Sequence, residues 1–196
     1  MKDQKRRAHP IKHFCTITKH RNRVIVHCFK IGIGFQGLFH DLSKYSPTEF
    51  IQGARYYVGY RSPTELEREM TGQSLAWMHH KGRNKHHFEY WNDVDPKTKE
   101  YRSVPMPKKY VAEMFCDRIA ASKIYKGKDY SDSSALEYYS RGNARAKMHE
   151  YTADTLEEWL KMLAEKGEAE TFAYIKSALR DRKKERKIIF WTNSYT

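Results

Sequence analysis

Histidine and aspartate are the residue types in this sequence best suited to chemistry, and four of them fall where helical patterns turn inward. His40 and Asp41 are adjacent, His20 lies upstream of them, and Asp117 lies far downstream. A buried imidazole or carboxylate must be paired, hydrogen-bonded or bound to a cation. We therefore expect these four side chains to converge on one divalent metal ion. Two imidazoles and two carboxylates without a thiolate suit Mn, Fe, Ni, Co, Zn or Mg, and they argue against a structural zinc site.

A second group of histidines lies between the adjacent pair and Asp117. Four of the ten histidines fall within nine positions, and aromatic residues flank them. Adjacent histidines cannot all point at one atom, so we expect about half of the group to bind metal or phosphate. The group consists of His79, His80, His86 and His87, with Trp77, Tyr90 and Trp91 beside it.

His27 is an alternative to His20 as the first ligand. The two are seven residues apart and share one face of a predicted helix, so periodicity does not separate them. A tight hairpin at Gly32 to Gly34 would bring His27 closer to the level of His40. His13 and His149 have no identifiable partner and are predicted to be surface residues.

The elements that must position these residues are helices. Apolar residues and histidines recur at steps of three and four from about Pro10 until Gly32, which predicts a first helix with His20 and His27 facing inward. Ser46-Pro47-Thr48-Glu49 reads as an N-cap, a helical first-turn proline and a capping-box glutamate. The further predicted segments are 35–44, 47–57, 63–80 with a kink near Gly72, a long loop over 83–105, and helices over 107–125, 134–140, 153–165 ending at Gly167, and 168–184.

Length and composition predict one all-α domain of about six to eight helices. The chain has 196 residues, and the expected division is a basic tail over 1–9, a helical domain over 10–187 and a C-terminal tail over 188–196. No run approaches the roughly 20 apolar residues of a membrane helix, and no apolar signal core follows the basic start, so a cytoplasmic protein without a membrane partner is expected. Three widely spaced cysteines indicate neither disulfides nor a zinc knuckle. The net charge of +13 favours phosphate-bearing partners, either nucleotides or nucleic acid.

The order His20, His40-Asp41, Asp117 resembles the H…HD…D pattern of the HD-domain superfamily of metal-dependent phosphohydrolases. The run from His40 to Lys44 is similar to the HD-x-x-K form common in that superfamily. More narrowly, most of the chain resembles a bacterial and phage family of unknown function. The residues that carry this closer resemblance are His40-Asp41-Leu42-Ser43-Lys44-Tyr45-Ser46-Pro47-Thr48-Glu49-Phe50, His79-His80-Lys81-Gly82-Arg83-Asn84-Lys85-His86-His87-Phe88-Glu89-Tyr90-Trp91 and Met114-Phe115-Cys116-Asp117-Arg118.

The HD resemblance implies an HD-type helical bundle in which metal-activated water attacks a phosphate ester. It favours His20 over His27 as the first ligand, and it implies that His80 with His86 or His87 completes a site for a second metal or for phosphate. Lys44, Arg83 and Arg118 are the expected contacts to the substrate phosphate. HD hydrolases of other branches often place an acidic pair after the HD motif, whereas this chain has Leu42-Ser43-Lys44, so the general acid is left unassigned.

Three functions fit these features. The first is a phosphohydrolase acting on a nucleotide or another small phosphorylated compound. The second keeps the site but binds two irons and activates oxygen, as an oxidase or oxygenase. The third is a basic nucleic-acid-binding protein without catalysis, in which Trp77, Tyr90 and Trp91 stack on bases and the basic termini contact phosphates. The sequence does not specify the oligomeric state.

Overall fold

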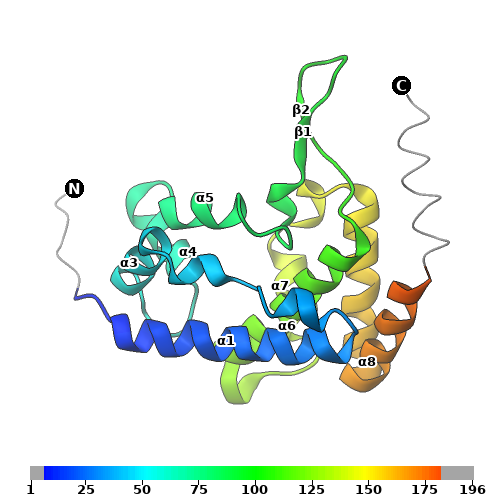
Figure 1. Cartoon of the computed structure of the whole chain (residues 1–196), viewed down its shortest axis with the longest axis horizontal. Coiled ribbons are helices and arrows are strands. Elements are labelled where there is room, and N and C mark those ends of the chain that lie inside the picture. The colour runs from blue at the N-terminus through cyan, green and yellow to red at the C-terminus, as the bar shows by residue number, and fades with distance from the viewer. Residues whose placement is uncertain (1–6, 182–196) are drawn as a thin grey trace.

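Helices account for nearly all of the regular structure. The computed structural model describes residues 7–181, and within them the prediction of an all-α fold is confirmed (Figure 1). The elements are α1 (Pro10–Lys30), α2 (Gly34–Gly37), η1 (Leu42–Tyr45), α3 (Pro47–Arg55), α4 (Pro63–Thr71), α5 (Leu75–Lys81), η2 (Phe88–Tyr90), β1 (Asn92–Val94), β2 (Tyr101–Ser103), α6 (Lys108–Lys126), η3 (Gly127–Asp129), α7 (Ser134–Arg141), η4 (Arg145–Lys147) and α8 (Glu150–Arg180), where η marks a 3-10 helix.

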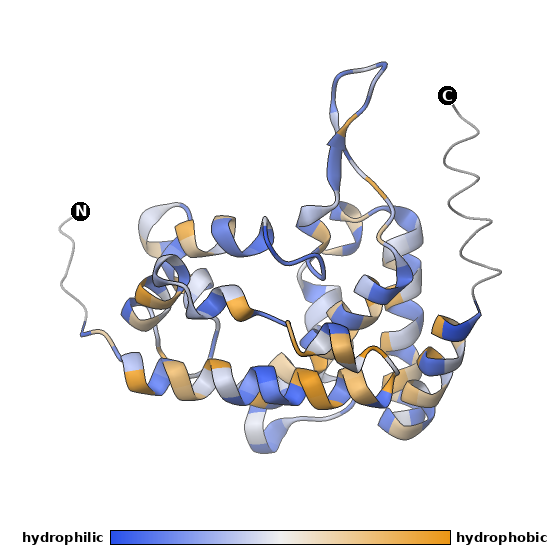
Figure 2. Ribbon diagram, viewed as in Figure 1, coloured by the Kyte–Doolittle hydropathy of each residue, from blue (hydrophilic) through white to orange (hydrophobic). Residues whose placement is uncertain are grey.

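Helix α6 lies at the centre of the packing. Six consecutive residues, from Val111 to Cys116, are buried, so this helix has neighbours on nearly every side. It packs against α1, α7 and α8, and the rings of Phe115 and Trp159 meet edge to face with centroids 6.1 Å apart. Figure 2 shows apolar residues concentrated where these helices meet. This core holds α1 and α6 side by side, and both helices carry predicted metal ligands.

The segment after α1 is not the continuous helix expected over 35–44. Helix α2 is a single turn that ends at Gly37, and Asp41 adopts a left-handed backbone conformation with φ of 54°. Glycine is needed at position 37 because a Cβ there would lie 2.5 Å from the Cβ of Cys28. The short helix therefore packs directly on α1, and the turn after it carries His40 and Asp41 to the inner face of α1.

The region 62–105 also departs from its predicted outline. The expected kink near Gly72 is a complete break, because Gly72 has φ of 81° and Ser74 begins α5 by accepting a hydrogen bond from the Trp77 amide. The predicted loop over 83–105 contains an antiparallel hairpin, β1–β2, which projects from the helices in Figure 1. Its strands have three residues each and are almost entirely exposed, so they carry no hydrophobic alternation by which the sequence could reveal them.

Helix α8 joins the two helices expected over 153–184. Gly167 leaves helical geometry with φ of 75°, which places the predicted break inside one long element. Residues 1–6 and 182–196 lie outside the described residues, and with them most of the predicted basic N-terminal tail, the end of the last helix and the C-terminal tail over 188–196. Between residues 7 and 181, no helix combines the length and apolar character needed to cross a membrane.

Candidate metal centre

Three elements bring the four predicted ligands together. His20 comes from the inner face of α1, His40 and Asp41 from the turn after α2, and Asp117 from α6. Donor atoms of all four side chains lie within 4.8 Å of one another. His20 Nε2 is 2.9 Å from Asp117 Oδ1, and His40 Nε2 is 3.3 Å from Asp41 Oδ2. Two donors that each lie about 2.1 Å from one metal at a right angle are about 3 Å apart, so these separations suit shared ligands.

The donor atoms themselves are buried and lack hydrogen-bond partners among the described residues. By hydrogen-bond geometry this holds for Nε2 of His20 and His40 and for both carboxylate oxygens of Asp41, one of which, Oδ2, forms an ion pair with Lys44. His20 Nε2 and Asp117 Oδ1 are close, but they do not have hydrogen-bond geometry. Buried polar atoms normally have partners. Their convergence here is the arrangement that a bound cation would satisfy.

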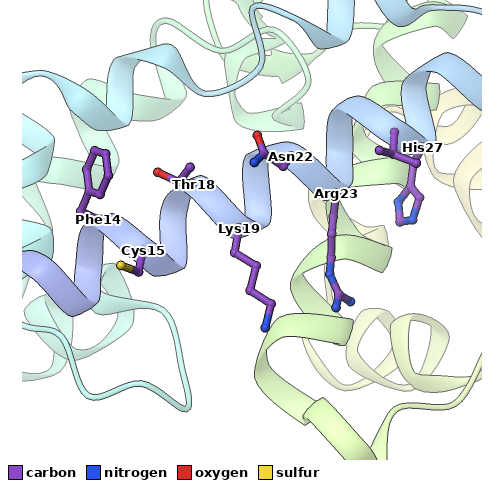
Figure 3. Close-up of a pocket in the computed structure, with 8 residues that line it drawn as sticks. Phe14, Cys15, Thr18, Lys19, Asn22, Arg23 and His27 are labelled. Carbon is purple, nitrogen blue, oxygen red and sulfur yellow. The ribbon is translucent and has the colours of Figure 1, made fainter.

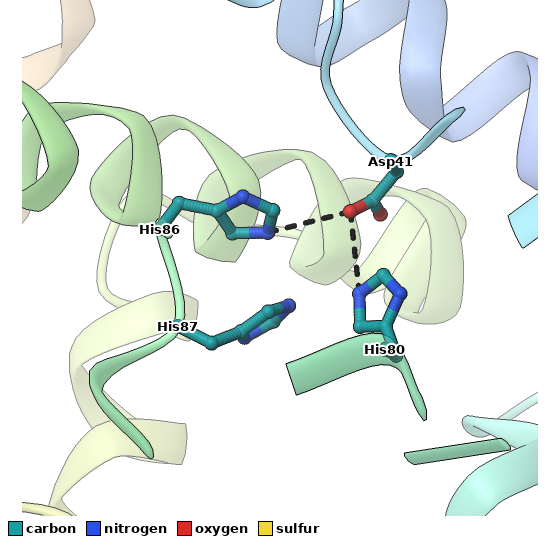
Figure 4. Close-up of side chains that lie close together, drawn as sticks. All are labelled: Asp41, His80, His86 and His87. Carbon is teal, nitrogen blue, oxygen red and sulfur yellow. Dashed lines mark ion pairs between the residues drawn. The ribbon is translucent and has the colours of Figure 1, made fainter. Parts of the chain in front are cut away.

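Asp41 also faces a second set of donors. His80 Nε2 lies 3.2 Å and His86 Nε2 3.4 Å from Asp41 Oδ1, and His87 lies beside them (Figure 4). Asp41, His80, His86 and His87 form a further group with donor atoms within 4.8 Å of one another, and His40, His86 and Glu113 form a third. These groups overlap at Asp41, His40 and His86, so the structure contains enough adjacent donors for two cations.

Two glutamates contact the imidazole rings at Nδ1, on the side away from the converging Nε2 atoms. Glu113 Oε1 lies 2.9 Å from His40 Nδ1 and 3.3 Å from His86 Nδ1, while Glu49 Oε2 lies 2.7 Å from His80 Nδ1. A carboxylate at Nδ1 keeps the proton there and leaves the Nε2 lone pair free to bind a metal. His40, His80 and His86 therefore have the orientation of metal ligands.

Charge is strongly coupled at this centre. Burial alone would raise the pKa of Asp41, but the neighbouring His40 imidazole and Lys44 ammonium hold it well below its usual value. Burial also opposes ionisation of Glu113, and its hydrogen bonds from His40 and His86 lower its pKa to about 2. The carboxylates consequently stay ionised at neutral pH, in the form that binds cations.

Contacts to the backbone and to Asp41 fix the turn that carries the His-Asp pair. Arg21 on α1 donates from Nε to the His40 carbonyl at 3.2 Å and from Nη2 to the Leu38 carbonyl at 2.5 Å. Lys44 Nζ lies 2.6 Å from Asp41 Oδ2. The positive φ of Asp41 turns its side chain away from the direction that a continuous helix would give it. Adjacent residues on one helix point about 100° apart, and this local conformation removes that restriction.

His27 lies away from this centre. It is buried, its Nδ1 lies 3.5 Å from the Cys116 carbonyl, and its ring packs against Phe172. Its side chain borders a separate hollow along α1 and points to the same side as Lys19 and Arg23 (Figure 3). The structure thus brings His20 to the other predicted ligands and leaves His27 as a core histidine.

Several other predicted residues are placed differently from expectation. His79 contacts Glu49 Oε1 at 2.6 Å and belongs to none of the three donor groups. Arg83 is exposed and donates to the His79 carbonyl, outside the cavity described below, so its expected phosphate contact is not supported. The prediction that His13 is a surface residue is wrong, because its ring is buried against Phe50 and Tyr57. His149 is partly buried and caps the start of α8 by accepting from the Tyr151 amide.

A cavity of about 430 Å³ opens onto the centre. His20, His80, His87 and Asp117 line it, so the candidate ligands are accessible from it. Lys44 and Arg118 line it too, as expected for contacts to an anion. Its remaining walls come from α1, α3, α4, α5, η2, α6 and α7 and from the connection between α3 and α4, which contributes Tyr57, Tyr60, Arg61 and Ser62.

Glu49 and Glu113 are the residues of the candidate site that the sequence did not reveal. Glu49 was expected to close a capping box with Ser46, but Ser46 makes no side-chain cap, and Glu49 binds the two histidines of α5. Glu113 sits one helical turn before Asp117 on α6, which places both on the same face. A glutamate four residues before a predicted metal ligand, inside a run of apolar residues, was the available signal.

The fold and the site together define an all-α protein with buried clusters of histidine, aspartate and glutamate that could hold a metal ion. The chain belongs to a family of unknown function, DUF5662, whose model matches residues 9–162. The match covers the whole candidate centre and ends within α8. No curated protein and no solved structure matches the chain significantly. The resemblance to the HD superfamily stays a prediction.

Proposed function

We propose that this protein is a metal-dependent phosphohydrolase that acts on a nucleotide or another small phosphorylated compound. His20, His40, Asp41 and Asp117 would hold one divalent cation of the Mn, Fe, Ni, Co, Zn or Mg group. The observation that carries the proposal is the convergence of buried donor atoms that lack hydrogen-bond partners among the described residues, including Nε2 of His40, whose Nδ1 is held by Glu113. This arrangement is typical of metal ligands with supporting carboxylates.

The cation would act as a Lewis acid on a phosphoryl oxygen and would lower the pKa of a bound water molecule. The protein's own side chains bind and orient the substrate. Lys44 and Arg118 both line the cavity at this end, and each can donate charge-assisted hydrogen bonds to phosphate oxygens. The Arg118 Nε is buried and has no hydrogen-bond partner among the described residues, so this side chain keeps an unused donor.

A second cation would use Asp41, His80, His86 and His87. The two donor groups share Asp41, whose Oδ2 faces His40 and whose Oδ1 faces His80 and His86. Asp41 would therefore be a ligand shared by both cations, and a pair of cations would stabilise the attacking and leaving oxygens of phosphoryl transfer. We therefore propose a binuclear centre.

The abundance of imidazole donors favours one alternative reaction class. Five histidines contribute to the two donor groups, and imidazole suits iron as well as zinc. A diiron oxidase or oxygenase would use the same residues. Redox-active iron in the purified protein, together with failure to hydrolyse phosphate esters, would favour this alternative over the hydrolase.

The test compares three forms of the full-length chain. Wild-type protein, His40→Ala and Asp41→Asn are purified, their metal content is measured by elemental analysis, and hydrolysis of generic phosphate esters is assayed with added Mn²⁺. Asparagine tolerates the left-handed conformation at position 41, so the second variant removes the charge without straining the backbone. We expect both variants to lose tight metal binding and turnover while retaining helical content by circular dichroism.

His27→Gln is the control, since it removes a buried histidine of α1 that lies outside the centre. It should retain the metal and the activity of the wild type. Equal metal occupancy in wild type and in the His40 and Asp41 variants would overturn the proposal. Binding of nucleic acid that survives both variants and weakens steeply with salt would instead indicate the basic nucleic-acid-binding function. The cytoplasmic location and the lack of a membrane partner stay predictions.

A further inference from the structure

The second donor group joins two segments that are far apart along the chain. Asp41 comes from the turn before η1, whereas the three histidines of the group come from α5 and the segment that follows it (Figure 4). Donor atoms from separate segments can bind one cation only if the segments keep a fixed relative position. Two buried or half-buried polar side chains outside the donor groups, Ser43 and Asn84, connect these segments.

Asn84 makes contacts on both sides of this junction. Its Nδ2 donates to Ser43 Oγ at 2.8 Å and to the His80 carbonyl at 2.8 Å. The amide nitrogen must be the atom that faces the carbonyl, because a carbonyl oxygen accepts and an amide oxygen cannot donate to it. The backbone carbonyl of Asn84 also accepts from the His87 amide at 3.1 Å. This residue therefore ties η1 to the end of α5 and to the turn that carries His87.

The number of available hydrogens fixes the direction of the hydrogen bonds around His80. The Asn84 amide has two N–H hydrogens, and Ser43 Oγ and the His80 carbonyl take both. The 3.1 Å contact between Asn84 Nδ2 and His80 Nδ1 therefore leaves no hydrogen for that nitrogen to accept. His80 Nδ1 carries its own proton and donates to Glu49 Oε2 at 2.7 Å.

Glu49 is the acceptor at the end of this network. Burial opposes its ionisation, but hydrogen bonds from His80, His79 and Ser43 hold its pKa below the usual value. Asn84 thus donates to Ser43, and both Ser43 and His80 donate to Glu49. This order leaves the lone pair of His80 Nε2 unprotonated on the side of Asp41 Oδ1, which lies 3.2 Å away. An unprotonated Nε2 is the form of imidazole that binds a metal ion.

We propose that Ser43 and Asn84 are positioning residues of the second donor group, and that they set its affinity for a cation without contacting the cation. This inference rests on the proposed binuclear centre. Loss of either side chain would remove the link between η1 and α5, so Asp41 and His80 would be held together less closely. Loss of a hydrogen bond outside the ligands typically lowers metal affinity 10- to 100-fold, and Ser43 is one bond further from the ligand than Glu49, so we expect an effect of about tenfold.

The test measures the two Mn²⁺ dissociation constants of the full chain by equilibrium dialysis and elemental analysis. The constant of the binding step that His80→Ala removes should rise about tenfold in Ser43→Ala and in Asn84→Ala, and the other constant should stay at its wild-type value. Ser43→Thr keeps the hydroxyl group and should restore wild-type binding. Ser46→Ala is the matched control, because Ser46 Oγ is buried and has no hydrogen-bond partner among the described residues.

Wild-type constants in a folded Ser43→Ala variant would overturn the inference, as would an equal loss in Ser43→Ala and Ser43→Thr. Nitrogen-15 NMR of the metal-free wild type gives a second readout, since it shows which nitrogen of the neutral His80 ring carries the proton. A proton on Nε2 would also overturn the inference. If the wild type binds two cations but hydrolyses no phosphate ester, the hydrolase proposal fails and the inference stands. If it binds only one cation, the binuclear centre and the inference fail together.

Discussion

Glu113 offers the sharpest test of the candidate centre. It contacts two candidate ligands, His40 and His86, but belongs to neither of the two four-residue donor groups. Its Oε1 lies 2.9 Å from His40 Nδ1 and 3.3 Å from His86 Nδ1, and Gln36 Nε2 donates to its Oε2 at 2.5 Å. Burial opposes ionisation of Glu113, but its contacts with His40 and His86 lower its pKa from 4.5 to about 2. A difference of about 2.5 pKa units corresponds to about 3 kcal/mol of favourable interaction with the ionised carboxylate.

Glu113→Gln removes that charge with almost no change in volume. The amide oxygen can still accept a hydrogen bond from one imidazole. The amide NH2 group, itself a donor, then faces another donor, either Gln36 or an imidazole. The loss in metal-binding free energy should therefore be smaller than the full interaction energy of the ionised carboxylate. We expect the dissociation constant to rise about 10- to 100-fold, the usual cost of losing a supporting carboxylate.

The assay is competition between the apoprotein and a chelator of known affinity, with thermal unfolding measured in parallel. Glu67→Gln is the control, since Glu67 is also a buried glutamate but contacts Ser74 and the Leu75 amide. Its metal affinity should equal that of the wild type. A folded Glu113→Gln variant whose dissociation constant changes less than twofold would refute the supporting role of this carboxylate and weaken the argument that the imidazoles are oriented for a metal.

Three further outcomes are expected. His80→Ala or His86→Ala should lower the metal content of Mn²⁺-loaded protein from about two ions per chain towards one, as measured by elemental analysis. His79→Ala should not lower it, because His79 belongs to no donor group. An equal loss of metal in all three variants would contradict this prediction. Gly53→Ala should cost about 1–3 kcal/mol of unfolding free energy in urea titration, because the new Cβ would lie 2.2 Å from His13 Nε2 and would force the ring to move, whereas Gly142→Ala, whose Cβ would meet nothing closer than 3.5 Å, should cost less. Burial, and to a smaller extent nearby lysines, lowers the pKa of both His13 and His27 in the folded chain from 6.5 to about 4. The unfolded chain therefore binds protons that the folded chain does not, and the free energy of unfolding should fall as the pH drops from about 6.5 to about 4. Each histidine should contribute about 2 kcal/mol of this loss between pH 7 and pH 5, and His27→Gln should show a correspondingly shallower dependence than the wild type; identical slopes would exclude His27 as a source.

Local sequence determined the helices of this protein and the faces that they bury. Apolar residues at steps of three and four, with prolines at first helical turns, are sufficient to place α1, α3, α6 and α7 within a few residues, because each is stabilised by its own periodic contact with the core. The inward direction of His20 and Asp117 follows from the same pattern. The order of His20, His40-Asp41 and Asp117 along the chain was enough to nominate the four ligands.

Tertiary structure decided which of these side chains meet. His20 and His27 are equivalent by periodicity, and only the position of the turn after α2 along α1 brings His20, and not His27, beside Asp41. That turn depends on the close contact of Gly37 with Cys28 and on the left-handed conformation of Asp41. The roles of Glu49 and Glu113 depend on partners 31 and 73 residues away. Periodicity indicates which side of one helix faces the core, but it contains no information about the axial offset between two packed elements. Whether donor side chains meet depends on that offset.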